Sequence, residues 1–141
     1  MMECRLAIEA LTLGADDDLS TAVVQTAETI AEREGTRLEL DVKAGVRVRR
    51  EARDALVRIA SEAVTNAARH GHAETIQVGL RNGREIVLRI HDDGVGFETS
   101  EIGEYSGFGL VSMRQRVQRL GGEFHVSSEP GSGTLVEVRI P

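Results

Sequence analysis

The sequence predicts an α/β fold of the two-layer α+β kind, with a mixed sheet covered on one face by about three helices. Two segments before residue 70 have apolar residues at helical spacing, and a third such segment begins at residue 110. Four segments that alternate with period two pair into two β-hairpins. With 141 residues, 40% hydrophobic and 28% charged, the chain has the size and composition of one globular domain.

The first part of the chain is expected to contain two helices and one strand. Asp18 or Ser20 caps the first helix, and Gly35 ends it, because glycine readily adopts the left-handed conformation at a helix end. Residues 37–42 alternate as a half-buried strand does. Residues 50–69 carry apolar side chains at helical spacing, which predicts a long amphipathic helix.

The second part is expected to contain two hairpins separated by a loop and a helix. The first hairpin turns at Asn82-Gly83, whose residues tolerate positive φ. Residues 97–106 are polar and lack periodicity, which predicts a mobile loop. Residues 110–120 alternate apolar residues with arginines and form a helix closed by glycine. The hairpin strands are residues 75–80 with 85–91, and residues 123–127 with 134–140.

Composition and charge narrow the class of protein. The net charge of −6 argues against a broad nucleic-acid surface, which depends on many basic contacts to phosphate. Cys4 is the only cysteine, so no internal disulfide and no thiolate zinc cluster can form. Because no apolar run approaches the ~18 residues of a membrane span, we expect a cytoplasmic protein, or the cytoplasmic part of a membrane sensor, without direct membrane contact. Residues 1–18 are expected to be a linker or the end of a preceding helix, and residues 19–141 the domain.

The segment S-E-A-V-T-N-A-A-R-H (residues 61–70) places Glu62 and Asn66 four residues apart on the second helix. Both side chains therefore project from one face and can reach one ligand. The asparagine carbonyl oxygen suits Mg²⁺, which takes few protein ligands together with phosphate oxygens. Glu62 is suited to orienting a water or accepting a proton. Asparagine is also a poor residue for a helix interior, which favours a functional reason for it.

Two glycine-containing segments follow. In D-D-G-V-G (residues 92–96), Asp92 directly follows a strand, and its carboxylate can accept a hydrogen bond from the exocyclic amine of adenine. Gly94 and Gly96 allow the backbone to approach a flat ring closely. The segment G-F-G (residues 107–109) opens a helix whose first amides favour phosphate. Each segment alone also fits an ordinary turn or helix start, and their order along the chain favours a nucleotide-binding domain.

Four segments resemble the N, G1 and G2 boxes and the terminal glycine-threonine turn of the GHKL ATPase superfamily. The similarity is greatest to the catalytic ATP-binding domains of bacterial sensor histidine kinases, in particular the nitrate-sensor-like group, and it covers about residues 19–141. It implies a Bergerat-type α/β sandwich that binds ATP between helices, sheet and a lid. The segments are E-A-V-T-N-A-A-R-H (62–70), D-D-G-V-G-F (92–97), G-F-G-L-V-S-M-R-Q-R (107–116) and G-S-G-T (131–134).

The resemblance assigns roles to individual residues. Asn66 becomes the Mg²⁺ ligand and, with Glu62, the catalytic pair. Asp92 becomes the adenine anchor, and Thr134 joins its hydrogen-bond network. The remaining nucleotide-binding residues that it implies are Arg69, His70, Gly94, Gly96, Phe97, Gly107, Phe108, Gly109 and Leu110.

The resemblance also implies an activity and partners. The domain would deliver the γ-phosphoryl of Mg-ATP to a histidine on a separate dimerisation domain, upstream of a response regulator. No histidine precedes His70, so we expect a catalytic domain taken from a longer chain or a free-standing relative, monomeric when isolated. Two alternatives stay open: a serine kinase and binding module like the anti-sigma-factor kinases, and a GHKL switch ATPase.

Overall fold

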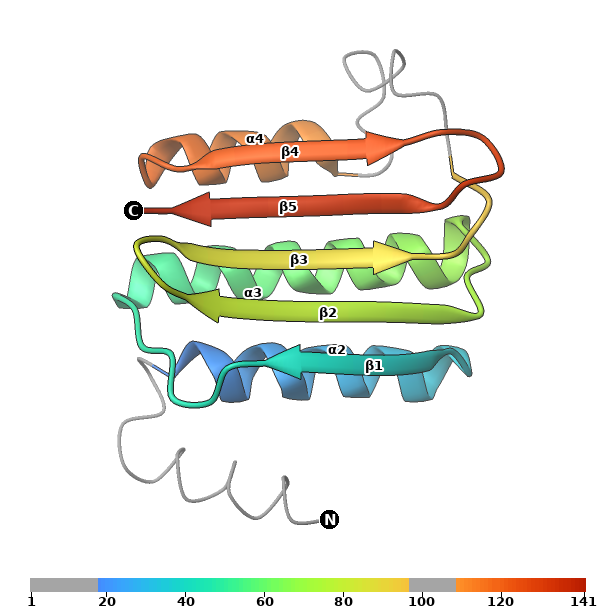
Figure 1. Cartoon of the computed structure of the whole chain (residues 1–141), viewed down its shortest axis with the longest axis horizontal. Coiled ribbons are helices and arrows are strands. Elements are labelled where there is room, and N and C mark those ends of the chain that lie inside the picture. Colours follow the sequence, from blue (N-terminus) through green and yellow to red (C-terminus); the bar gives the residue numbers. More distant parts are fainter. Residues whose placement is uncertain (1–17, 97–108) are drawn as a thin grey trace.

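The computed structural model, which describes residues 18–96 and 109–141, contains a mixed five-stranded sheet in the order β1-β2-β3-β5-β4 (Figure 1). Strands β1 and β2 run parallel, and every other neighbouring pair is antiparallel. The parallel pair is joined through a helix, as such a connection requires. The strands are β1 (Arg37–Val42), β2 (Thr75–Asn82), β3 (Ile86–Asp92), β4 (Glu123–Ser128) and β5 (Thr134–Ile140).

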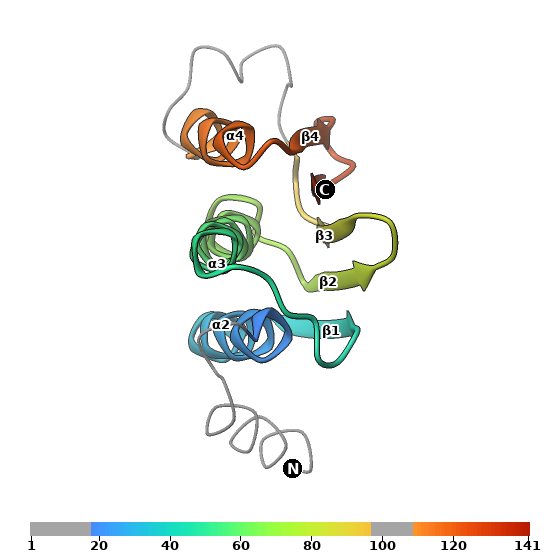
Figure 2. The same ribbon diagram turned by 90° about the vertical axis from the view of Figure 1, so that its left-hand side faces the viewer.

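Helices cover one face of this sheet, so the predicted two-layer α+β fold is confirmed (Figure 2). Strand residues alternate between this buried face and solvent, as the patterns in β2 and β3 show. The largest fully buried side chains, among them Leu56, Ile76, Leu88 and Met113, fill the space between the layers. The helical elements are α2 (Leu19–Glu34), α3 (Arg50–Thr65), the π-helical turn η2 (Asn66–His70) and α4 (Leu110–Arg119).

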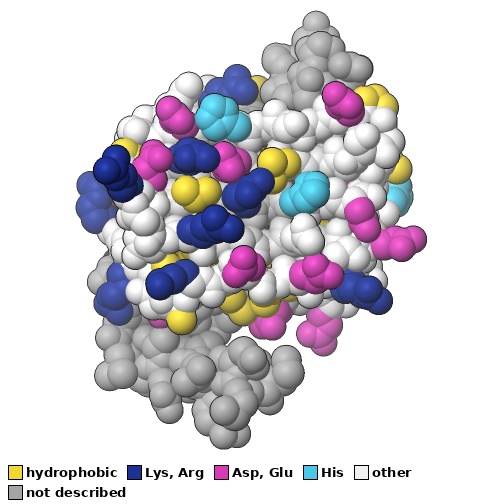
Figure 3. Space-filling view, viewed as in Figure 1, with side chains coloured by type: hydrophobic (Ala, Val, Ile, Leu, Met, Phe, Trp, Pro, Cys, Tyr) yellow, Lys and Arg dark blue, Asp and Glu magenta, His cyan; other side chains and the backbone are white. Residues whose placement is uncertain are grey.

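The other face of the sheet is open and carries interspersed arginine and acidic side chains (Figure 3). Arg89 and Arg139 both pair with Glu137 there, at 3.2 Å each. Within the described ranges, no helix is long and apolar enough to cross a bilayer.

Helix α2 begins and ends where the sequence predicts. The Asp18 carboxylate accepts hydrogen bonds from the Thr21 backbone N–H and hydroxyl, both at 3.0 Å, and so caps the helix. Gly35 ends it at φ 72°. Ser20, the other predicted cap, lies inside the helix and donates to the Lys43 carbonyl at 2.6 Å. Asp18 thus belongs to the described fold, and residues 1–17 of the predicted linker lie outside the described residues.

The end of the second helix differs from the regular helix that the sequence predicts. Residues 66–70 form a π-helical turn, in which the Gly71 N–H donates to the Asn66 carbonyl at 2.8 Å, five residues earlier. A Cβ on Gly71 would lie 2.8 Å from the Ala67 carbonyl oxygen, so glycine allows the chain to turn this tightly. Such turns occur frequently at functional sites.

The first hairpin is confirmed, but its turn is not the expected one. Asn82 still pairs with Ile86 inside the ladder, which leaves residues 83–85 to make the turn. Gly83 donates to the Glu85 carbonyl at 3.1 Å, and neither Asn82 nor Gly83 has positive φ. The connection is therefore not the two-residue turn in which Asn-Gly would adopt positive φ.

Candidate functional site

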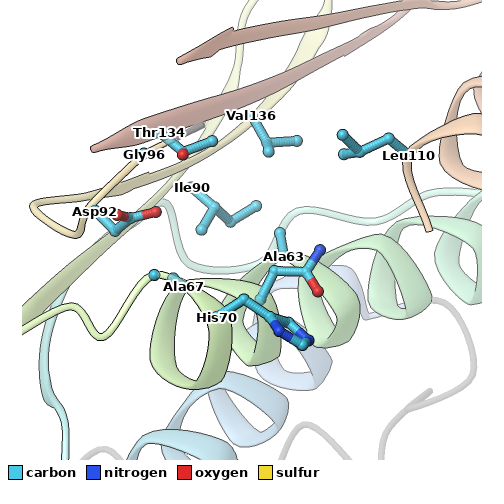
Figure 4. Close-up of a pocket in the computed structure, with 11 residues that line it drawn as sticks. Ala63, Ala67, His70, Ile90, Asp92, Gly96, Leu110, Thr134 and Val136 are labelled. Atoms are coloured by element: carbon cyan, nitrogen blue, oxygen red, sulfur yellow. The ribbon is translucent and has the colours of Figure 1, made fainter. Parts of the chain in front are cut away.

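A pocket opens between the end of the second helix and the sheet, where β3 ends and β5 begins (Figure 4). Asp92 and Thr134 lie on the sheet side, and Ala67 and His70 lie on the helix side. Leu110, the first residue of α4, contributes a further wall and is buried. The lining residues are Ala63, Asn66, Ala67, His70, Gly71, Ile90, Asp92, Gly96, Leu110, Thr134 and Val136.

Asp92 is the buried charged group of the sheet wall, with 6% of its surface exposed. One carboxylate oxygen accepts a hydrogen bond from the Gly94 N–H at 2.7 Å. Burial raises the pKa of this carboxyl above its usual value, although the N–H groups of Gly94 and Thr134 and the nearby His91 partly oppose the shift. The side chain is therefore held in place by the turn that follows it, and it lines the pocket.

The turn after β3 packs against the turn between β4 and β5. Val95 accepts a hydrogen bond from the Gly131 N–H, and it donates to the Gly71 carbonyl at 2.8 Å. Gly96 and Gly133 have φ of 68° and 76°, and a Cβ on either would collide with backbone of the opposing turn or strand. These glycines are thus needed because three chain segments meet here with no side-chain layer between them.

Asp93 has a structural role that the sequence did not predict. Its carboxylate accepts hydrogen bonds from the backbone N–H groups of Glu74, at 2.9 Å, and Thr75, at 3.0 Å. The Thr75 and Glu74 N–H groups lower the pKa of the Asp93 carboxyl. Asp93 therefore fixes the start of β2 to the turn that carries Asp92 and Gly94. A signal was available in the doubled D-D, since only one of two adjacent carboxylates can point into the pocket.

Asn66 and His70 are the polar side chains of the helix wall, and both come from the π-helical turn. Among the described residues, no three His, Cys, Asp or Glu side chains come together as a resident metal cage would require. Asn66 can offer a carboxamide oxygen at the pocket. One or two such oxygens, completed by phosphate and water, are what Mg²⁺ takes in nucleotide sites. The donor set fits a magnesium ion that enters with a nucleotide.

Glu62 does not line the pocket, although it lies one turn before Asn66. Its Oε1 is 3.5 Å from Arg58 Nε, and its Oε2 is buried without a hydrogen-bond partner among the described residues. A Cβ on Gly109 would collide with this same oxygen. Glu62 thus packs directly against the backbone at the start of α4, where Gly109 has φ 72°.

Arg69 points to the neighbouring helix instead of the pocket. Its Nε donates to Glu34 Oε2 at 2.9 Å, an ion pair that joins η2 to the end of α2. Of the predicted site residues, the structure brings six together around the pocket: Asn66, His70, Asp92, Gly96, Leu110 and Thr134. Gly94 does not line the pocket, but its N–H holds the Asp92 carboxylate. Phe97, Gly107 and Phe108, together with the predicted mobile loop, lie outside the described residues.

Comparison with known proteins links this site to a family. The model of the family described as Histidine kinase-, DNA gyrase B-, and HSP90-like ATPase matches residues 51–141. The chain is 43% identical over 89 residues to the Sensor protein VraS of Staphylococcus haemolyticus and equally to that of Staphylococcus aureus strain N315. Each match covers 62% of this chain and 25% of the relative, so the chain spans about a quarter of the length of these relatives.

Solved structures show the same fold. The histidine kinase domain from the blue-light activated histidine kinase of Erythrobacter litoralis EL346 superposes with a TM-score of 0.78 at 22% sequence identity. That superposition covers 99% of this chain and 71% of the other. A second structure of the same kinase gives a TM-score of 0.76 at 24% identity, over 96% of this chain and 47% of the other.

Proposed function

The chain belongs to the histidine kinase-, DNA gyrase B- and HSP90-like ATPase family, and from that premise we propose that it is the ATP-binding catalytic domain of a sensor histidine kinase. Its relatives named as sensor proteins support this reading over the serine-kinase and switch-ATPase alternatives. In the proposed reaction, the γ-phosphoryl of Mg-ATP passes to a histidine on a separate dimerisation domain, and a response regulator acts downstream.

The buried carboxylate of Asp92 is the observation that carries the proposal. It is held by the Gly94 N–H at 2.7 Å and lies in a pocket whose other walls are largely apolar, from Ala63, Ile90 and Val136. A flat heteroaromatic ring matches apolar walls, and an amine at its edge matches a fixed acceptor. Adenine has such an amine, whereas guanine presents a carbonyl at the same position.

The phosphates would extend from the base toward the helix wall and the start of α4. Asn66 would provide the carboxamide oxygen for Mg²⁺, which neutralises phosphate charge when it is bound. His70 lies on the same turn and can donate a hydrogen bond to phosphate oxygen. The backbone amides that follow Gly109 stand at the N-terminus of the ten-residue helix α4, where anions are stabilised.

Glu62 and Arg69 would act beside this set. Glu62 Oε2 is buried against Gly109 and would accept a hydrogen bond from a hydroxyl group or a water molecule bound there. Arg69 would reach phosphate only after release from Glu34. Transfer to a histidine then depends mainly on positioning and charge neutralisation, since phosphoryl transfer needs little covalent chemistry from the protein.

Two measurements test the proposal. Calorimetry should give clear binding of ATP and ADP and much weaker binding of GTP. The domain should also transfer ³²P from γ-labelled ATP to a separately supplied helical hairpin that carries the phosphoacceptor histidine, with only slow hydrolysis when it is alone. Equal affinity for ATP and GTP would remove Asp92 from base recognition, and fast hydrolysis without any acceptor would favour a switch ATPase.

A further inference from the structure

Ser128 lies at the end of β4, directly behind the pocket wall. It is buried, with 5% of its surface exposed, and it does not line the pocket. Its hydroxyl lies 3.0 Å from the Gly133 carbonyl oxygen and 2.8 Å from the Thr134 hydroxyl. Ser128 and Thr134 are also paired residues of the β4–β5 ladder, so the second contact is fixed by strand register.

The number of protons on the two hydroxyls favours one direction for the hydrogen bond between them. A serine hydroxyl has one proton, and the Gly133 carbonyl and Thr134 Oγ1 are both within hydrogen-bond distance of the Ser128 hydroxyl. Gly133 is buried, so its carbonyl would lose a partner at a substantial free-energy cost if Ser128 donated elsewhere. The arrangement that satisfies all three groups has Ser128 donating to Gly133 and Thr134 donating to Ser128.

The consequence appears on the pocket side of Thr134. In this arrangement the Thr134 hydroxyl donates its proton to Ser128 and presents only lone pairs to a ligand. Thr134 pairs with Asp92 across the β3–β5 ladder, and both residues line the pocket (Figure 4). Two hydrogen-bond acceptors therefore stand side by side on neighbouring strands.

We infer that Ser128 is a positioning residue that sets base specificity, by holding the Thr134 hydroxyl as an acceptor beside Asp92. This inference rests on the proposed binding of ATP and deepens it. A pair of acceptors suits a ligand edge that carries two N–H donors, as the exocyclic amine of adenine does, either directly or through one water that donates to both. A Thr134 hydroxyl that is free to rotate would donate as readily as accept, and would therefore distinguish less between purines with and without this amine.

The test compares ATP with purine riboside 5′-triphosphate, which has the same ring and phosphates but no amine at position 6. In the parent domain, ATP should bind more tightly than this analogue. Ser128→Ala should weaken ATP binding about fivefold, the effect of one net hydrogen bond, and weaken the analogue less than about twofold. Ser128→Thr, which keeps the hydroxyl, should preserve the parent ratio. Ser127→Ala is the matched control, because Ser127 is the exposed neighbour on the same strand.

A second arm separates positioning from loss of structure. Thr134→Val removes the hydroxyl while keeping side-chain shape, and Ser128→Ala added to it should then leave the ratio of the two affinities unchanged. An equal loss for both nucleotides in Ser128→Ala, or no loss for either, would overturn the role of Ser128. If the parent itself binds both nucleotides equally, the proposed adenine recognition fails, and the role of Ser128 fails with it.

Discussion

Replacing Asp92 with asparagine should weaken ATP binding and, at neutral pH, stabilise the domain without ligand. The asparagine carbonyl can still accept the hydrogen bond from the Gly94 N–H, so the turn is preserved. The second carboxylate oxygen, however, becomes an NH₂ donor facing the amine of the base. Loss of a hydrogen bond to a charged group costs about 1.5–3 kcal/mol, or roughly a tenfold to hundredfold rise in Kd.

The stability of the ligand-free domain should change in the opposite direction. Burial raises the pKa of the Asp92 carboxyl above 3.8, so the protonated carboxyl is the form that the folded domain favours. This contribution to stability is fully present below the unfolded pKa and is lost as pH rises through the folded pKa. An asparagine is never ionised. Asp92→Asn should therefore match the parent in acid and become progressively more stable than the parent toward neutral pH.

Paired measurements would check both effects. Chemical denaturation of the two proteins, repeated across the acid-to-neutral range, gives the difference in unfolding free energy, in which the titration of other groups largely cancels. Calorimetry gives the ATP affinities under the same conditions. A variant that binds ATP like the parent, or one that is less stable than the parent by a constant amount at every pH, would refute the reasoning.

Three further predictions concern neighbouring positions. Asn66→Ala should weaken ATP binding in Mg²⁺ more than in EDTA, as measured by calorimetry, and equal losses would contradict the metal role. Gly94→Ala should lower the free energy of unfolding by about 1–3 kcal/mol, because the added Cβ would lie 2.9 Å from the Gly71 carbonyl carbon. Gly79→Ala is the matched control, since a Cβ on Gly79 would have no atom nearer than 3.8 Å. In denaturant titrations at neutral pH, Asp93→Ala should have a lower free energy of unfolding than the parent. This difference should shrink as pH falls through the lowered pKa of Asp93, because the parent then loses the same contribution to stability. A difference that stays constant in acid would contradict this role of Asp93.

Local signals predicted most of the fold correctly. The Asp18 cap and the Gly35 end of α2 depend on contacts within a few residues, and such contacts can be read from short segments. The π-helical turn at Asn66 could not be predicted in this way. It depends on Gly71, whose carbonyl accepts from the Val95 N–H, and therefore on a contact between segments far apart in the sequence.

The same distinction separates the predicted from the unpredicted site residues. Asp92 and Thr134 belong to short motifs, and the strand register places them opposite each other. Asp93 and Ser128 act through partners that only the assembled fold supplies. For Asp93 these are the N–H groups of Glu74 and Thr75, and for Ser128 the Gly133 carbonyl. Motif reasoning therefore identifies groups that face a ligand more readily than the groups that hold them in place.

Arg69 shows what a motif cannot decide, namely which of two anions a flexible cation contacts. In the described structure its partner is Glu34, at 2.9 Å, and the pair is partly open to solvent, with Arg69 54% and Glu34 19% exposed. If phosphate competes for the same guanidinium, removing the carboxylate charge should favour the nucleotide. Glu34→Gln should then tighten Mg·ATP binding by about two- to fivefold at low salt, the scale of an exposed ion pair, with less gain at high salt. The gain should vanish in an Arg69→Gln background, whereas Glu34→Gln without any change in ATP affinity would show that Arg69 stays with α2 and leaves phosphate to other groups.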